Sequence, residues 1–193
     1  DDAPTTLVAA LLQTAHKHAD KGITYIDASG RDDFQSYGDL LKEARGVLAG
    51  LRGGGLQPKD RVMLQIDNLR HHFTCFWGCV LGGIIPVTVA VAPTYRDQNA
   101  VNTKLFNTWK LLQQPAIITS AHIADEVQSL ETLFDMSGLT TLLFEEIQAD
   151  ELAEDSYECK PDDIVFYQLT SGSTGVPKCI RETHAGIIAH IHG

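Results

Sequence analysis

Apolar and polar positions follow one another along the first third of the chain in a way that predicts two helices and a hairpin. Residues 6–18 carry an apolar stripe at helical spacing, which indicates an amphipathic helix. A second helix is expected to begin after Ser36 and to end at the three glycines 53–55. Between the two helices, the extended runs 23–27 and 34–36 flank a polar segment that contains glycine. We therefore expect a short β-hairpin near the N-terminus.

From residue 61 onward, strand-like and helix-like segments alternate. This alternation predicts parallel β-α-β units with right-handed crossovers, and thus an α/β fold with a mostly parallel sheet flanked by helices. Such sheets bind ligands at the carboxyl ends of their strands, so we expect the chemistry to follow the last predicted strand. The expected strands are 61–66, 84–89, 116–119, 141–144 and 164–169, and the expected helices are 69–81, 98–113 and 122–134.

One segment raises the alternative of a membrane span. Residues 71–95 contain no Asp, Glu, Lys or Arg, and 73–92 is long enough to cross a bilayer. However, Gly82, Gly83 and Pro86 interrupt the segment, and the residues change there from a helical to a β-branched pattern. A buried helix that leads into a buried parallel strand explains the missing charges, so we expect no membrane span.

The composition is that of a globular protein, with 44% apolar and 21% charged residues in 193 positions, the size of one domain or of part of a larger one. The net charge of −10 is concentrated in 121–160, which holds 11 acidic residues and one basic residue and is expected to form a solvated face. This charge disfavours nucleic acid as a partner. Four cysteines without a C-x-x-C pair, and no visible signal peptide, favour a cytoplasmic protein with reduced thiols.

The expected strand 164–169 leads directly into a segment rich in glycine and hydroxyl side chains. Glycines let the backbone approach a ligand closely, hydroxyls add hydrogen-bond donors, and a lysine adds positive charge, which together suit a polyphosphate. The other interpretation is a surface turn, because turns share this composition. We expect the sheet to end at this strand and the lysine to lie in a loop. The candidate site residues are Thr170, Ser171, Gly172, Ser173, Thr174, Gly175 and Lys178.

The spacing excludes three well-known motifs. Counted from Gly172, a Walker A loop requires glycine at position 177 and serine or threonine at position 179. The sequence instead has Pro177, which lacks an N–H donor, and Cys179, which lacks a hydroxyl. A nucleophile elbow around Ser173 requires glycine at position 171. The S-x-x-K motif of β-lactamases requires a lysine three residues after the serine, which neither Ser171 nor Ser173 has.

The order of residues in 170–178 resembles the phosphate-binding signature of the adenylate-forming superfamily. This superfamily includes acyl-CoA synthetases, luciferases, fatty acyl-AMP ligases and adenylation domains of nonribosomal peptide synthetases. Cys179 departs from the pattern, which usually has glycine there. Residues 36–40 and 82–87 are similar to two earlier elements of the family. The glutamine at position 168, just before the motif, resembles the residue found there in fatty acyl-AMP ligases and in loading domains of microcystin-type hybrid assembly lines.

The resemblance implies that a carboxylate and MgATP react to give acyl-AMP and pyrophosphate, followed by transfer to a carrier-protein thiol. Thr170 to Gly175 would then hold the β- and γ-phosphates, and Lys178 would be the catalytic lysine that neutralises the departing pyrophosphate. We expect residues 1–193 to be the N-terminal portion of an adenylation domain, ending just after the phosphate loop. The magnesium ligand, the acyl pocket and the rest of the domain are expected elsewhere, so these residues alone should be inactive.

Two other histidine- and cysteine-bearing patterns are interpreted as packing or surface, with no metal expected. His71, Cys75 and Cys79 share one helical face, but a structural zinc site takes four ligands, and cysteine is often buried. His184, His190 and His192 have no thiol or carboxylate beside them. The alternative function is a non-catalytic α/β module that binds an anion such as phosphate. Carboxylate-dependent pyrophosphate exchange distinguishes this module from the enzyme.

Overall fold

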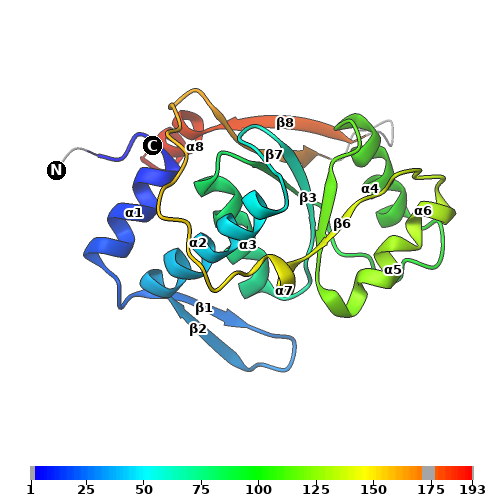
Figure 1. Ribbon diagram of the computed structural model, residues 1–193, viewed down its shortest axis with the longest axis horizontal. Coiled ribbons are helices and arrows are strands. Elements are labelled where there is room, and N and C mark those ends of the chain that lie inside the picture. Colours follow the sequence, from blue (N-terminus) through cyan, green and yellow to red (C-terminus); the bar gives the residue numbers. More distant parts are fainter. Residues whose placement is uncertain (1–2, 171–176, 193) are drawn as a thin grey trace.

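The protein is built around one six-stranded sheet with a separate two-stranded hairpin (Figure 1), and the computed structural model describes residues 3–170 and 177–192. The strands are β1 (Gly22–Ile26), β2 (Asp32–Ser36), β3 (Arg61–Gln65), β4 (Ile85–Thr88), β5 (Ala116–Thr119), β6 (Thr141–Leu143), β7 (Ile164–Thr170) and β8 (Lys178–Thr183). In the large sheet their order is β6-β5-β3-β4-β7-β8, and only β7 and β8 run antiparallel. The expected α/β fold, with its mostly parallel sheet and its N-terminal hairpin, is confirmed.

Helices cover both faces of this sheet. Helices α2 and α3 pack against one face, while α4 and α5 pack against the other. The helices are α1 (Leu7–Lys17), α2 (Tyr37–Gly53), α3 (Leu69–Leu81), α4 (Ala100–Leu111), α5 (Ala124–Gln128), α6 (Leu130–Leu133), α7 (Phe144–Ile147) and α8 (His184–His192), with one 3₁₀ turn at Ala121–Ile123.

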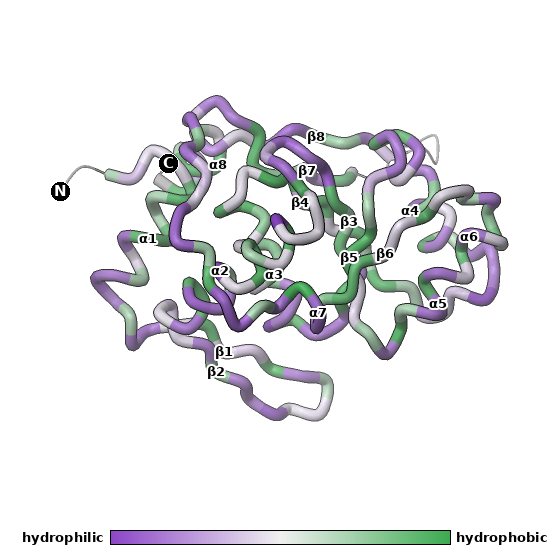
Figure 2. Tube along the Cα trace, in the orientation of Figure 1, coloured by the Kyte–Doolittle hydropathy of each residue, from purple (hydrophilic) through white to green (hydrophobic). Residues whose placement is uncertain are grey.

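The central strands are apolar at consecutive positions because both of their faces are buried. In β3, Val62 and Leu64 belong to the core under α2 and α3, and Met63 between them belongs to the core under α4. Alternate side chains of a strand point to opposite faces, so a strand with helices on both sides needs apolar residues at every position. Figure 2 shows this as hydrophobic colour along the middle of the sheet.

The first two helices begin where the sequence predicts. The Thr6 hydroxyl accepts a hydrogen bond from the Ala9 N–H at 3.1 Å, and the Ser36 hydroxyl accepts one from the Asp39 N–H at 3.0 Å. Each bond satisfies a backbone donor that has no partner inside the helix. Arg70 pairs with Asp33 of β2 at 2.8 Å, so the hairpin between the first two helices is joined to α3.

The charge-free segment folds as helix α3 followed by strand β4, as the sequence predicts. Gly83 joins the two elements at a φ of +66°, a conformation that favours glycine. A Cβ atom there would also lie 2.4 Å from the Tyr157 ring, so the turn has no room for a side chain. Among the residues described, no helix is both long enough and apolar enough to cross a membrane.

The sequence prediction is wrong for the helix 122–134. The structure divides this stretch into a 3₁₀ turn, α5 and α6, with a break at Ser129. The Ser129 hydroxyl donates to the Glu126 carbonyl oxygen at 2.6 Å, a local bond that competes with regular helical bonding.

The expectation of a solvated acidic face is confirmed, since ten of the eleven acidic residues in 121–160 are exposed and Glu131 is half-buried.

The sheet does not end at β7, which corrects a second expectation. Residues Lys178–Thr183 form the antiparallel strand β8 along the outer side of β7. The Thr183 hydroxyl then accepts a hydrogen bond from the Gly186 N–H at 3.1 Å and opens helix α8. Lys178 is therefore the first residue of a strand rather than part of a loop.

Candidate active site

Strand β7 carries Thr170 to the carboxyl edge of the parallel strands. It lies between β4 and β8, so it is an interior strand of the sheet. Val165 and Tyr167 are buried, whereas Gln168 is exposed and the remaining residues of the strand are half-buried. The predicted strand is confirmed, but only some of its residues are buried. Thr170 is its last residue and is half-buried.

The structure brings Thr170 and Lys178 together. They are directly paired in the antiparallel ladder between β7 and β8, so their side chains lie on the same face of the hairpin. Lys178 is exposed to solvent. The other five candidate residues lie in the connection between the two strands, outside the described residues: Ser171, Gly172, Ser173, Thr174 and Gly175.

Cys179, which departs from the family pattern, continues the strand without disruption. It pairs with Leu169 and packs against the core beneath α4. Burial raises the pKa of the Cys179 thiol, so the group stays protonated near neutral pH. The cysteine therefore acts here as a small apolar residue of the sheet.

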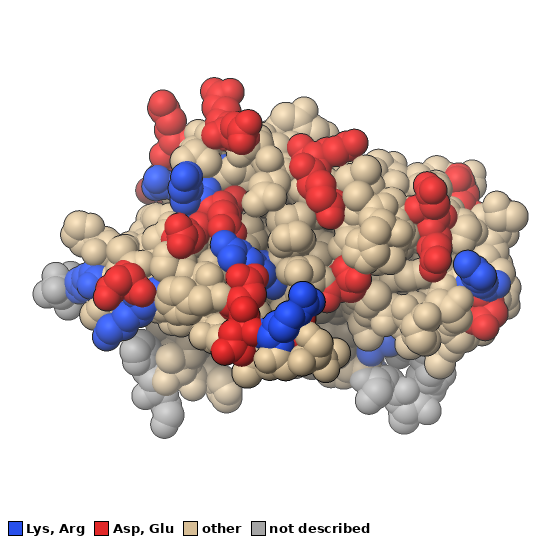
Figure 3. Space-filling model, turned by 90° about the horizontal axis from the view of Figure 1, so that it is seen from below, with Lys and Arg blue, Asp and Glu red and all other residues tan. Residues whose placement is uncertain are grey.

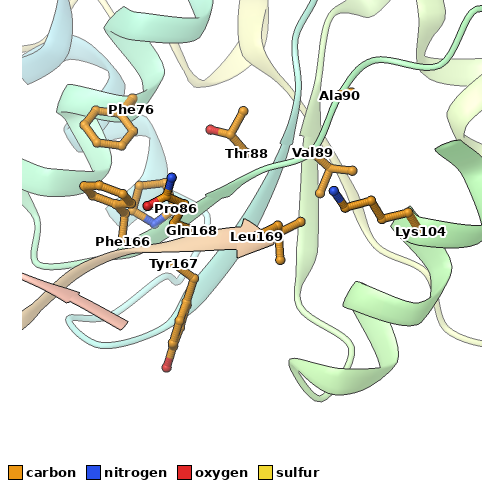
Figure 4. A pocket seen from close by; sticks show the side chains of 10 residues that line it. All are labelled: Phe76, Pro86, Thr88, Val89, Ala90, Lys104, Phe166, Tyr167, Gln168 and Leu169. Atoms are coloured by element: carbon orange, nitrogen blue, oxygen red, sulfur yellow. The ribbon is translucent and has the colours of Figure 1, made fainter. Parts of the chain in front are cut away.

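A cavity of about 320 Å³ opens beside this hairpin, at the carboxyl ends of β4 and β7 (Figure 4). β4 and β7 are paired at Val87 and Tyr167, and residues that follow Val87 in the chain line the cavity together with Tyr167. One end of the cavity holds Phe76 and Phe166, whose ring centroids are 5.6 Å apart. The cavity is lined by Phe76, Pro86, Thr88, Val89, Ala90, Lys104, Phe166, Tyr167, Gln168 and Leu169.

The sequence analysis did not identify Lys104, which comes from helix α4. In Figure 4 its side chain extends from the helix toward Val89, with the amine at the cavity end. Lys104 precedes Thr170 by 66 positions, and no spacing rule connects the two. Only the crossover that places α4 over the sheet brings this lysine to the cavity.

The loops after β3 and β5 form a second polar cluster that the sequence did not reveal. Ser120 donates to one carboxylate oxygen of Asp67 at 2.9 Å, and the His122 ring lies 2.8 Å from the other. Partial burial on its own would raise the pKa of Asp67, but the hydrogen bonds from Ser120 and His122 outweigh it and lower the pKa. The cluster borders a cavity of about 750 Å³ beneath the tip of the β1–β2 hairpin.

Figure 3 shows that acidic side chains outnumber basic ones on the face of the molecule seen there.

The histidine and cysteine pattern on α3 is explained by packing. Cys75 and Cys79 are fully buried, and the His71 ring stacks on Phe144 with centroids 4.5 Å apart. Within 3–170 and 177–192, no group of three or more His, Cys, Asp or Glu side chains is arranged to hold a metal ion.

Comparisons with known proteins agree with this architecture. The adenylation domain of a keto acid-selecting NRPS module, bound to keto acyl adenylate, superposes with a TM-score of 0.89 at 38% identity, over 98% of this chain and 34% of that one. McyG A-PCP complexed with phenylalanyl-adenylate gives 0.88 at 35% identity, over 100% of this chain and 36% of that one. A benzoate–CoA ligase of Thauera aromatica is 29% identical over 85% of this chain and 31% of its own length.

The chain thus spans about a third of the length of these three proteins. The family described as AMP-binding enzyme matches residues 11–193, which is nearly the whole chain. The match includes β7, β8 and the segment between them, where the sequence motif resembles the adenylate-forming signature. The chain belongs to the AMP-binding enzyme family, and its resemblance to adenylate-forming enzymes is confirmed.

Proposed function

We propose that residues 1–193 are the N-terminal part of an adenylation domain, which uses ATP to activate a carboxylic acid. The observation that carries this proposal is the pairing of Thr170 with Lys178 across the β7–β8 hairpin, at the carboxyl edge of the sheet. This arrangement presents a hydroxyl and an ammonium group at the two ends of a glycine-rich connection. Family membership and the two adenylate-bound structural relatives support it.

In the proposed reaction, a carboxylate oxygen of the acid attacks the α-phosphorus of ATP. A new C–O–P linkage forms, the bond between the α-phosphorus and the bridging oxygen breaks, and pyrophosphate leaves with the electron pair. Thr170 and the segment Ser171 to Gly175 hold the β- and γ-phosphates through N–H and hydroxyl donors. Lys178 is the proposed catalytic residue, because its ammonium group stabilises the charge that develops on pyrophosphate.

Further parts of the reaction are assigned to other regions of the full-length protein. Magnesium would neutralise the phosphates, and its ligand is proposed to lie outside residues 1–193. A ribose anchor, an acid pocket and the C-terminal lysine of the family are also expected elsewhere. Since each positions a different part of the reactants, we propose that residues 1–193 alone are inactive.

The acceptor in the second step is proposed to be the thiol of a carrier protein. The A-PCP structure favours a carrier, whereas the benzoate–CoA ligase exemplifies the alternative of coenzyme A. The proposed substrate is a small carboxylic acid, and the proposed location is the cytoplasm. All four cysteines, Cys75, Cys79, Cys159 and Cys179, are free in the structure.

Exchange of labelled pyrophosphate into ATP by the full-length protein tests the proposal. An adenylating enzyme catalyses this exchange only when a suitable carboxylic acid is present, so a panel of aryl, keto and fatty acids is required. Binding of ATP or phosphate without exchange for any acid would instead support the non-catalytic anion-binding module. Residues 1–193 alone serve as the control and are expected to show no exchange.

A further inference from the structure

Lys104 differs from every other lysine of this protein in its burial. The sequence contains eight lysines, all of them within the described ranges. Seven are exposed, and Lys104 alone is half-buried. An ammonium group is strongly hydrated, so a lysine is normally found with its charged end in water. The position of Lys104 at the cavity of β4 and β7 therefore requires an explanation.

The described part of the chain provides no counter-charge for this ammonium group. The protein has 25 acidic and 15 basic residues, and Arg31, Arg52, Arg70 and Arg96 all pair with carboxylates. Among residues 3–170 and 177–192, Lys104 forms no ion pair, although acidic residues are abundant. A half-buried cation that faces a cavity without a carboxylate is well suited to an anionic ligand.

The pleat of β7 relates Lys104 to the start of the phosphate loop. Leu169 lines the cavity together with Lys104. Thr170 is the next residue, so its side chain points to the opposite face, where it pairs with Lys178. The two lysines therefore approach the end of β7 from opposite faces of the sheet.

We propose that Lys104 is a second lysine that binds the polyphosphate of ATP, opposite Lys178. The proposal rests on the function proposed above. Polyphosphate carries several negative charges, and one lysine neutralises only part of them. Val89 and Leu169 line the cavity together with Lys104, and the side chain extends from α4 with its ammonium group toward Val89 (Figure 4). Lys104 binds the departing group, whereas Lys178 remains the catalytic lysine.

The test is the substitution Lys104→Met in the full-length protein, which keeps the length of the side chain and removes its charge. The KM for ATP should rise about 10-fold, the effect of losing one hydrogen bond to a charged group. The dissociation constant for pyrophosphate, measured by equilibrium dialysis, should rise by a similar factor, whereas that for AMP should not change. Lys104→Arg should restore most of the affinity, because it restores the charge.

Lys110→Met is the matched control. Lys110 lies on the same helix, is exposed, and holds its ammonium group 5.4 Å from the Phe106 ring centroid, away from the cavity. The variant Lys110→Met should leave the KM for ATP and the dissociation constants for pyrophosphate and AMP unchanged. An unchanged ATP KM and pyrophosphate affinity in Lys104→Met would overturn the proposal, as would a rise confined to the KM of the carboxylic acid, since the cavity would then bind the acid.

The dialysis measurement separates this proposal from the proposed function. If the wild-type protein binds pyrophosphate but catalyses no exchange, the adenylation function is wrong, and the affinity of Lys104→Met for pyrophosphate still decides the role of Lys104. Thermal unfolding of each variant identifies a general folding defect. Where Lys104→Met unfolds, Lys104→Gln provides the same comparison, and retained pyrophosphate affinity in it contradicts the proposal.

Discussion

Thr170 and Lys178 face each other as a directly paired position in the antiparallel ladder of β7 and β8. The pairing fixes the two ends of the connection whose sequence resembles the phosphate-binding signature, with Thr170 at the end of an interior strand and Lys178 on the outer one. The sheet thereby holds a hydroxyl and a cation on one face. This relationship leads to the first two predictions.

Replacing Lys178 by alanine should lower the pyrophosphate-exchange rate of the full-length protein by about 10- to 150-fold, the range expected for a lost contact to a charged group. Lys178 is exposed on the outermost strand, so the melting temperature should change little. Lys160→Ala, at another exposed lysine, is the control. Exchange at the wild-type rate in Lys178→Ala contradicts the catalytic assignment.

Replacing Thr170 by valine should have a smaller effect, about a 2- to 12-fold loss of exchange, because a neutral hydrogen bond contributes less than a charged one. Valine keeps the β-branched shape that suits a strand, so β7 should form normally. Thr24→Val, at an exposed position of the β1–β2 hairpin, should leave the exchange rate unchanged. A larger loss of exchange rate in Thr170→Val than in Lys178→Ala would contradict the roles assigned to the two residues.

We expect the folded protein to lose stability in acid because of a hydrogen bond made by His184. Its Nδ1 accepts a hydrogen bond from the Leu7 N–H at 3.0 Å, which joins α8 to α1 and requires an unprotonated nitrogen. Burial lowers the pKa of His184, although the Asp163 carboxylate opposes this effect. A lowered pKa means that the stabilisation is fully present above the ordinary value of 6.5 and is lost as the pH falls below it.

Urea unfolding at pH 7.5 and at pH 5 measures this effect. His184→Gln retains an acceptor that does not titrate, so the free energy of unfolding should depend less on pH than in the wild type, by about 1 kcal/mol for the hydrogen bond. Burial also lowers the pKa of His72, which contributes equally to both proteins. His190→Gln, exposed on the same helix, is the control, and equal pH dependence in all three proteins contradicts the prediction.

Gly83→Ala should destabilise the protein more than Gly138→Ala. Both glycines have a positive φ, +66° and +80°, and the left-handed conformation costs alanine about 1–2 kcal/mol. A Cβ atom at Gly138 meets nothing within 4 Å, whereas at Gly83 it meets the Tyr157 ring. This contact should add about 1–3 kcal/mol. Equal unfolding free energies of the two variants would show that the Tyr157 ring moves aside without cost.

The sequence predicts those elements whose local pattern and tertiary environment agree. Helix α3 begins and ends at the predicted residues because Asn68 caps its first turn and Gly82 follows its last residue. Strand β3 is recognised because it is buried on both faces. The helix 122–134 is predicted wrongly because apolar spacing alone does not reveal the local hydrogen bond of Ser129.

Strand β8 and Lys104 could not be predicted because both depend on distant parts of the chain. Most of β8 is polar or half-exposed, since it pairs only with β7 and lies at the edge of the sheet. Lys104 has no sequence signal, because an isolated lysine on a helix is usually a solvated side chain. Its position at the cavity follows only from the fold, which brings Lys104 of α4 and Leu169 of β7 to the same cavity.

The most direct test of the central claim uses a carboxylic acid labelled with ¹⁸O in both carboxylate oxygens. The full-length protein is incubated with this acid, ATP and hydroxylamine, and the nucleotide product is analysed by mass spectrometry. Adenylation leaves the bridging oxygen of acyl-AMP on the phosphorus, so the account predicts AMP that carries one ¹⁸O atom for each hydroxamate formed. AMP without ¹⁸O, or ¹⁸O in inorganic phosphate with ADP as the product, would contradict it.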